Sequence, residues 1–227
     1  MSSARDRILA SIRSGLPHAE LPGATEARPV LPPAPAAAAP NDLSALFEAA
    51  LTALTGTVHH AATPAAVAHA VASIAASCGA GTYLAWDEAE IGCPGLFEAL
   101  TARGLRRVTY DLPFDAGGRD AGVRALEDVG LGITGADAGL ADGGALVLAS
   151  GPGRGRLASL LPPVHVAILS ASKLIPSLPA LLAARPDLVG RGSNFVAIAG
   201  PSRTADIEMT LTHGVHGPKH VHVILTA

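Results

Sequence analysis

The sequence predicts an α/β fold in which a mostly parallel sheet is flanked by helices. Short apolar segments alternate with helical patterns along most of the 227 residues, which is typical of βαβ units. Apolar residues make up 49% of the chain but aromatic residues only 3%, so the core must consist mainly of Ala, Val, Leu and Ile. Such side chains suit helices packed on a parallel sheet.

The chain begins with a segment that predicts an amphipathic helix over residues 1–16. Ser3 and Asp6 have capping-box spacing, with Asp in place of Glu, and the apolar residues between Ile8 and Leu16 fall on one helical face. Residues 17–40 are rich in Pro and Ala and predict a semi-rigid linker. The apolar face of this helix therefore needs a partner, either its own domain or another chain.

We expect the folded domain to span residues 41–227 and to begin with a helix capped by Asn41 or Asp42. Apolar runs predict strands at 57–60, 83–86, 107–110, 132–134, 145–149, 164–169, 195–199 and 221–226. Helical patterns predict helices at 64–78, 94–103, 119–129, 173–184 and 204–213. In parallel sheets ligands bind beyond the carboxyl ends of the strands, which directs attention to the loops after Ala149, Leu169 and Ala199.

Composition and charge exclude several classes of function. The net charge of −3 and the scarcity of aromatic residues argue against a nucleic-acid binder. No apolar run reaches the ~20 residues that cross a bilayer, and the amino terminus lacks a signal-peptide pattern, so we expect a cytoplasmic protein without a membrane span. The two cysteines, Cys78 and Cys93, are too few for an iron–sulfur cluster and are expected to be buried, as small apolar residues in a reducing compartment.

The strongest motif follows the strand at 195–199 and runs from Gly200 to Glu208. Gly-Pro breaks the strand, and Ser202 or Thr204 is placed to cap a helix whose free N–H groups favour an anion. Arg203 adds a forked donor for a carboxylate or phosphate. The alternative is an ordinary capped helix whose arginine pairs with Asp206 or Glu208.

A second motif, residues 213–218, follows directly. Gly214 suits the end of the predicted helix, and Gly217-Pro218 forces a turn before the last strand. His213 and His216 could contact a ligand or shape the loop. A metal is the less favoured reading, because the spacing of these histidines and of His220 and His222 matches no strong zinc signature.

A third segment surrounds the strand at 145–149. Asp142-Gly143-Gly144 precedes this strand, and a glycine-rich loop with Arg154 and Arg156 follows it. Glycine lets a backbone approach a ligand closely, and the two arginines could clamp an anion, whereas a mobile surface loop is the plainer interpretation. Ligand contacts are predicted for these residues of the three segments: Gly200, Ser202, Arg203, Thr204, Asp206, His213, His216, Asp142 and Gly144.

Together these motifs resemble those of the lactate-utilisation protein C family, which carries the LUD domain. The two motifs at 200–208 and 214–218, a Leu-Pro-Pro-Val-His run at 161–165 and the segment 136–141 carry the resemblance, which covers residues 41–227. It implies a fold akin to sugar-phosphate isomerases and CoA transferases, and a role in oxidising L-lactate to pyruvate beside iron–sulfur oxidoreductase subunits. One departure is the run 143–145, where the family commonly has Thr-Gly-Thr or Thr-Gly-Ser.

Three hypotheses remain open at this point. The first is a subunit of a lactate-oxidising system that holds a small anionic ligand near the two motifs. The second, by analogy of fold alone, is an independent enzyme acting on a phosphorylated sugar or an acyl-CoA, with Asp142 or Asp206 as the base. The third is an interaction module that docks through its first helix. The sequence indicates no bound cofactor and no metal ligand set.

Overall fold

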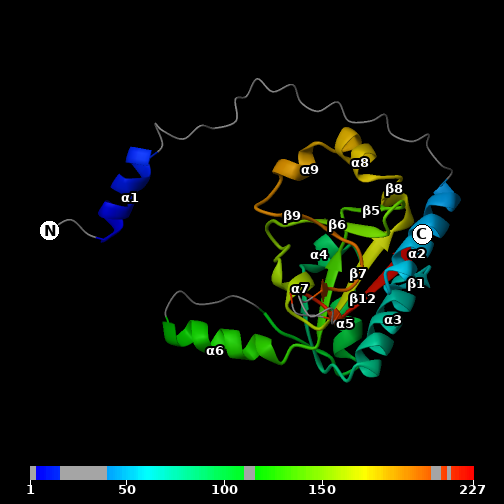
Figure 1. Cartoon of the computed structure of the whole chain (residues 1–227). Coiled ribbons are helices and arrows are strands. Elements are labelled where there is room, and N and C mark those ends of the chain that lie inside the picture. Colours follow the sequence, from blue (N-terminus) through cyan, green and yellow to red (C-terminus); the bar gives the residue numbers. More distant parts are fainter. Residues whose placement is uncertain (1–3, 16–39, 110–115, 206–210, 214–215) are drawn as a thin grey trace. The chain divides into compact units, whose positions relative to one another are not determined.

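The chain consists of two units, residues 1–32 and 33–227. The computed structural model describes five stretches of the chain: residues 4–15, 40–109, 116–205, 211–213 and 216–227. Helix α1 (Ala4–Gly15) forms in the first unit, as expected (Figure 1). None of its side chains is buried. The linker predicted for residues 17–40 lies outside the described residues, apart from Pro40.

A six-stranded sheet, parallel throughout, forms the centre of the second unit. Its strands lie in the order β1-β12-β7-β4-β2-β3. Their bounds are β1 (Thr57–Ala61), β2 (Thr82–Ala85), β3 (Arg106–Arg107), β4 (Leu131–Gly135), β7 (Val164–Ser170) and β12 (His220–Thr226). Each overlaps a strand predicted from the sequence, although the edge strands β1 and β3 are only partly buried. The inner strands β4 and β7 are buried along nearly their whole length, as expected of mostly apolar runs.

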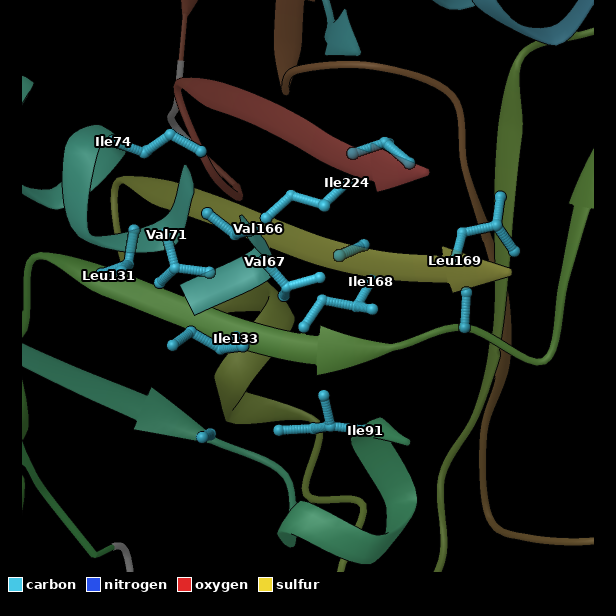
Figure 2. Close-up of a cluster of buried hydrophobic side chains, with 14 of the residues drawn as sticks. Val67, Val71, Ile74, Ile91, Leu131, Ile133, Val166, Ile168, Leu169 and Ile224 are labelled. Carbon is cyan, nitrogen blue, oxygen red and sulfur yellow. The ribbon is translucent and has the colours of Figure 1, made fainter. Parts of the chain in front are cut away.

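Helices cover both faces of this sheet. On one face, α3 (Pro64–Ser77) lays Val67, Val71 and Ile74 over the apolar side chains of β4 and β7 (Figure 2). The short helix α7 (Leu157–Leu160) contacts β4, β7 and β2. It approaches so closely that a Cβ on Gly132 would lie 1.8 Å from the carbonyl oxygen of Ala158.

Helices α2, α4, α5 and α6 also belong to this domain. Helix α2 (Pro40–Ala53) contacts β1, and α5 (Leu96–Thr101) contacts α3. The single-turn helix α4 (Glu88–Ile91) contacts β4, and α6 (Ala116–Glu127) overlaps the helix predicted at 119–129.

The domain also contains a second, smaller sheet that is not parallel throughout, which the prediction of one mostly parallel sheet did not include. It is mixed and has the order β8-β5-β6-β9, in which β6 runs antiparallel to both of its neighbours. The bounds are β5 (Ala138–Leu140), β6 (Ala145–Ala149), β8 (Leu174–Ile175) and β9 (Phe195–Ile198). Because β6 and β9 belong to this sheet, the carboxyl-end rule does not apply to the loops after Ala149 and Ala199.

Two helix predictions need correction. The helix predicted at 173–184 begins only at α8 (Leu178–Ala184), where Ser177 caps it through an oxygen that accepts from the N–H of Ala180. The preceding residues form a 3₁₀ turn, η2 (Ala171–Lys173), and then pair as β8. The second short helix on this side is α9 (Asp187–Gly190).

The helix predicted at 204–213 is wrong. The residues at its two ends are strands β10 (Arg203–Ala205) and β11 (Leu211–His213), which pair antiparallel with Arg203 opposite His213. Residues 206–210 lie outside the described part of the chain. Backbone pairing between the two ends therefore replaces the local hydrogen bonds that a helix would have made.

Candidate functional site

The two strongest sequence motifs form one structural unit. The N–H of Ser202, in the first motif, donates to the carbonyl oxygen of Pro218, in the second, at 2.9 Å. The pairing of β10 with β11 joins the same two segments a few residues further along. We call the described residues 200–205, 211–213 and 216–218 the motif hairpin.

Backbone conformation and close packing explain why glycine stands at the two glycine positions predicted to contact a ligand. Gly200 is buried with φ +80°, and a Cβ there would lie 2.8 Å from the carbonyl oxygen of Leu54. Gly144 has φ +57°, and a Cβ there would lie 2.3 Å from the amide nitrogen of Leu51. Both glycines therefore allow close approach to the carboxyl-terminal end of α2, and this packing accounts for them without a ligand.

The motif hairpin leads into the amino-terminal edge of the parallel sheet. The N–H groups of Lys219 and His220 both donate to the carbonyl oxygen of Pro163, at 2.8 and 3.1 Å, just before β12 and β7 begin. Ligands of open parallel sheets usually bind at the opposite edge, beyond the carboxyl ends of the strands. A ligand on the motif hairpin would thus be held by a site added to the fold and not by the crevice that parallel topology creates.

The predicted ligand-binding residues fall into three groups. Ser202 and His216 lie in the motif hairpin, where Ser202 is half-buried and His216 exposed. Arg203, Thr204 and His213 contribute backbone to the paired strands. Asp206 lies outside the described residues.

Asp142 and Gly144 belong to the turn between β5 and β6. Asp142 is exposed, and its N–H donates to the carbonyl oxygen of Pro176 at 3.0 Å. The anion cradle predicted at a helix N-terminus is not formed, because the residues at its start are a strand. A contact between an anion and this region would have to come from side chains and from backbone N–H groups of the hairpin.

Sequence reasoning missed the charged cluster around Arg154. Its Nε donates to Oε2 of Glu90 at 2.6 Å, and its Nη1 donates to Oδ1 of Asp137 at 2.7 Å. Burial disfavours the charged form of Arg154, but the hydrogen bonds to Asp137 and Glu90 outweigh it, and the pKa of the guanidinium is raised. Because its guanidinium already binds two carboxylates, Arg154 has a structural role and is poorly suited to bind a further anion. Asp137 could have indicated this cluster, because it is a charged residue within the otherwise buried run 131–141.

The glycine-rich loop after β6 is anchored along its length. Nε1 of Trp86 donates to the carbonyl oxygen of Gly155 at 3.1 Å, and the N–H of Asp87 donates to that of Gly153 at 2.8 Å. The guanidinium of Arg154 also lies over the Trp86 ring, 5.4 Å from its centroid. These contacts contradict the interpretation of this segment as a mobile surface loop.

A pocket opens at the carboxyl edge of the parallel sheet. Its lining includes Ala61, Thr63, Val67 and Thr226, at the ends of β1 and β12 and the start of α3, and Cys93, just after α4. The oxygen of Thr63 already accepts from the N–H of Ala66 as the helix cap. Burial, with a smaller contribution from Glu88, raises the pKa of the Cys93 thiol, which makes it a poor nucleophile.

The histidines form contacts that the sequence did not resolve. His165 is fully buried, its Nε2 lies 2.9 Å from Oγ1 of Thr134, and its Nδ1 has no hydrogen-bond partner. Burial, with a contribution from His222, lowers the pKa of His165 to about 4. Nε2 of His59 lies 3.1 Å from Nδ1 of His222; His59 is half-buried, whereas its neighbour His60 is exposed. Within the described stretches, no group of three or more His, Cys, Asp or Glu side chains could hold a metal ion.

Comparison with known proteins identifies the family. Residues 44–226 match the family model described as the LUD domain. A lactate utilization protein C from Geobacillus sp. (strain WCH70) is 33% identical over 160 residues, which cover 67% of this chain and 66% of that protein. One from Halalkalibacterium halodurans is 45% identical over 102 residues, covering 42% and 44%. The matched regions thus span about half to two thirds of the length of these relatives.

A solved structure agrees with the fold. The crystal structure of a DUF162 family protein from Deinococcus radiodurans superposes with a TM-score of 0.60, covering 84% of this chain and 100% of that one, at 17% sequence identity. That likeness shows the fold alone. In the part of the chain that the structure describes, no helix is long and apolar enough to cross a membrane. With the family model matching residues 44–226, the chain belongs to the LUD domain family.

Proposed function

We propose that the chain is a subunit of a system that oxidises L-lactate to pyruvate, and that it binds a small anionic ligand at the motif hairpin. The observation that carries the proposal is the hydrogen bond from Ser202 to Pro218, together with the pairing of Arg203 opposite His213. These contacts gather an arginine, two histidines and a serine from two separate motifs into one short segment. The relatives named lactate utilization protein C supply the pathway.

The chemistry of the hairpin suits this ligand class. Lactate and pyruvate each carry one carboxylate, and a guanidinium such as that of Arg203 is the side chain best matched to it. Removing two electrons from lactate requires an acceptor, and we assign that role to iron–sulfur oxidoreductase partners. Cys78 and Cys93 are too few to hold a cluster in this chain. The expected burial holds for Cys93 but is wrong for Cys78, which is exposed.

A genetic experiment tests the pathway. We expect deletion of the gene to abolish growth on L-lactate as sole carbon source while leaving growth on glucose unchanged, and a plasmid copy to restore it. An Arg203→Ala copy should fail to restore growth, whereas an Arg119→Ala copy, altered at an exposed position of α6, should succeed. Normal growth on lactate after deletion, in a host without a second copy of the gene, would contradict the pathway assignment.

A binding experiment tests the site separately. Calorimetric titration of the purified full chain with L-lactate and with pyruvate should show saturable binding. The Arg203→Ala variant should show no binding, and the Arg119→Ala variant should bind as the native chain does. Binding that survives Arg203→Ala would move the ligand away from the motif hairpin even if the growth phenotype holds. Iron–sulfur proteins should copurify with the tagged chain. If they still do so when hairpin residues are substituted, the partner assignment is supported independently of the ligand.

A further inference from the structure

A pocket of about 230 Å³ forms where three loop regions of the domain meet. Glu90, in its lining, belongs to α4, which follows the carboxyl end of β2. Ser150 and Arg154 follow β6 of the mixed sheet, and Arg191 follows α9. The pocket therefore lies on the side of the domain where ligands of parallel sheets usually bind, whereas the motif hairpin leads into the other edge of that sheet.

Backbone contacts bring Arg191 to this pocket. The N–H of Ser150 donates to the carbonyl oxygen of Asn194 at 2.9 Å, which extends the antiparallel pairing of β6 with β9 toward Arg191. A Cβ on Gly192 would lie 1.8 Å from the carbonyl oxygen of Ser150, so a glycine is needed for this close approach. The position of Arg191 is thus set by the pairing of two strands.

Four charged side chains form a continuous run of contacts at the pocket. Oδ1 of the buried Asp137 accepts from Nη1 of Arg154 at 2.7 Å and lies 3.6 Å from Nη1 of Arg191. Nε of Arg154 in turn donates to Oε2 of Glu90 at 2.6 Å. Arg191 and Glu90, at the two ends of this run, line the same pocket, so one small molecule can contact both.

These two end residues are the ones with capacity for a ligand. The side chain of Arg191 is 49% exposed, and its contact with Asp137 is longer than a hydrogen bond. Glu90 is 35% exposed and uses one carboxylate oxygen for Arg154, while a carboxylate can accept several hydrogen bonds. The pocket therefore presents a forked cationic donor and an anionic acceptor to the same ligand.

We infer that the pocket binds a small α-amino acid, with its carboxylate on Arg191 and its ammonium group on Glu90. A guanidinium matches a carboxylate, and an ammonium group supplies charged donors to the carboxylate of Glu90. Such a ligand has no net charge, like the cluster of two arginines and two carboxylates that receives it. A monocarboxylate without an ammonium group would bring a second negative charge to Glu90. This site goes beyond the lactate binding proposed for the motif hairpin and does not depend on it.

The class of ligand is tested on the native full chain. Equilibrium dialysis against radiolabelled L-alanine should show saturable binding at millimolar concentration, and unlabelled L-alanine should displace the label. N-acetyl-L-alanine and L-lactate lack the ammonium group and L-alaninamide lacks the carboxylate, so each should displace at least about tenfold less well. Absence of saturable binding, or displacement by any of these three compounds as strong as by L-alanine, would overturn the inference.

Variants test the place of binding. Arg191→Gln should weaken the binding of L-alanine by about tenfold or more. Arg156→Gln is the matched control, because it removes the same charge from an exposed position next to the pocket's lining, and it should bind L-alanine as the native chain does. Arg203→Ala, in the motif hairpin, should also keep the binding of L-alanine. Retained affinity in Arg191→Gln, or lost affinity in Arg203→Ala, would overturn the site.

The role of Glu90 has a readout that a purely structural role would not change. In Glu90→Gln the amide oxygen can still accept from Arg154, but the negative charge that faces the ammonium group is removed. We expect the preference for L-alanine over N-acetyl-L-alanine to fall by about tenfold in this variant. An unchanged preference would overturn the assignment of the ammonium group to Glu90.

Discussion

The guanidinium of Arg154 lies 2.7 Å from Oδ1 of Asp137, and this pair links the two sheets of the domain. Asp137 lies where the chain leaves β4 of the parallel sheet and enters β5 of the mixed one. Its second oxygen accepts from the N–H of Ala149 at the end of β6, at 2.8 Å. Only 7% of the Asp137 side chain is exposed, and its nearest cation is this arginine, with Nη1 of Arg191 further off at 3.6 Å from the same oxygen.

Removing the arginine should therefore destabilise the whole domain. We expect Arg154→Ala to lower the free energy of unfolding by roughly 2–4 kcal/mol, because it leaves the buried carboxylate of Asp137 with only the more distant Arg191 as a cation. Arg154→Lys should lower the free energy of unfolding less, because it keeps the positive charge. It should still cost stability, because an ammonium group cannot bond Glu90 and Asp137 as the forked guanidinium does. Urea unfolding followed by the fluorescence of Trp86, the single tryptophan, measures both.

An exposed ion pair provides the control for that measurement. Arg185 contacts Asp187 through two hydrogen bonds, at 3.0 and 3.1 Å, but both side chains are about half exposed. Arg185→Ala should barely move the urea midpoint, since solvent screens such pairs. Equal losses for Arg154→Ala and Arg185→Ala would show that the buried cluster has no special role.

Neighbouring glycines in the turn before β6 should respond differently to alanine. Gly144→Ala places a Cβ at positive φ and against the backbone of α2, and should cost at least about 1–2 kcal/mol of stability. Gly143 faces open space without a positive φ, so Gly143→Ala should leave stability unchanged or slightly raised. Thermal unfolding of the two variants compares them, and equal shifts would contradict the packing explanation of Gly144.

Acid should destabilise the domain through His165. Its folded pKa of about 4 lies below the ordinary value of 6.5, so the unfolded chain binds the proton more readily. The neutral ring therefore contributes its full stability above pH ~6.5, and up to about 3 kcal/mol is lost as the pH falls toward ~4. Denaturant unfolding across this range measures the slope.

The matched variant for that slope replaces both members of the buried pair. In Thr134→Val/His165→Leu, apolar side chains take the place of the hydrogen-bonded hydroxyl and imidazole, so no polar atom of the pair is left unsatisfied. We expect the stability of this variant to depend less on pH between ~6.5 and ~4. A slope as steep as that of the native chain would assign the effect to other groups.

The two thiols should differ sharply in reactivity. Cys78 is exposed, whereas Cys93 is buried and its pKa is raised, first by burial and then by Glu88. An aromatic disulfide reagent should label one thiol in the folded chain and the second only after unfolding. Cys78→Ser should abolish the labelling of the folded chain, and rapid labelling of that variant would contradict the burial of Cys93.

Sequence patterns predicted the parallel sheet well and the mixed sheet poorly. The run 164–169 is apolar apart from His165, since both faces of β7 are covered, and its strand character is local information. The three-residue β5 and the two-residue β8 were missed, because strands this short are defined by the partners they pair with. The segment 204–213 carries a helical pattern, yet its ends pair as strands.

For the candidate site, sequence reasoning predicted the motifs but not their setting. The sequence placed a helix between Gly200–Ser202 and Gly217–Pro218, so the hydrogen bond from Ser202 to Pro218 that joins the two motifs was not predicted. The location of this unit at the amino-terminal edge of the sheet was not predictable. It depends on how β9, in the mixed sheet, directs the chain back toward the start of β12.

By itself, then, the sequence determined the α/β class, the six strands of the parallel sheet, and the residues that mark the family. Only the tertiary structure decided which strands form the second sheet, that two arms of the strongest motifs pair as a hairpin, and that Arg154 is held by Asp137 and Glu90. Those partners lie 17 and 64 residues away along the chain. Periodicity reports which face of an element is apolar, whereas pairing, ion pairs and the contact between His59 and His222 depend on residues that folding brings together.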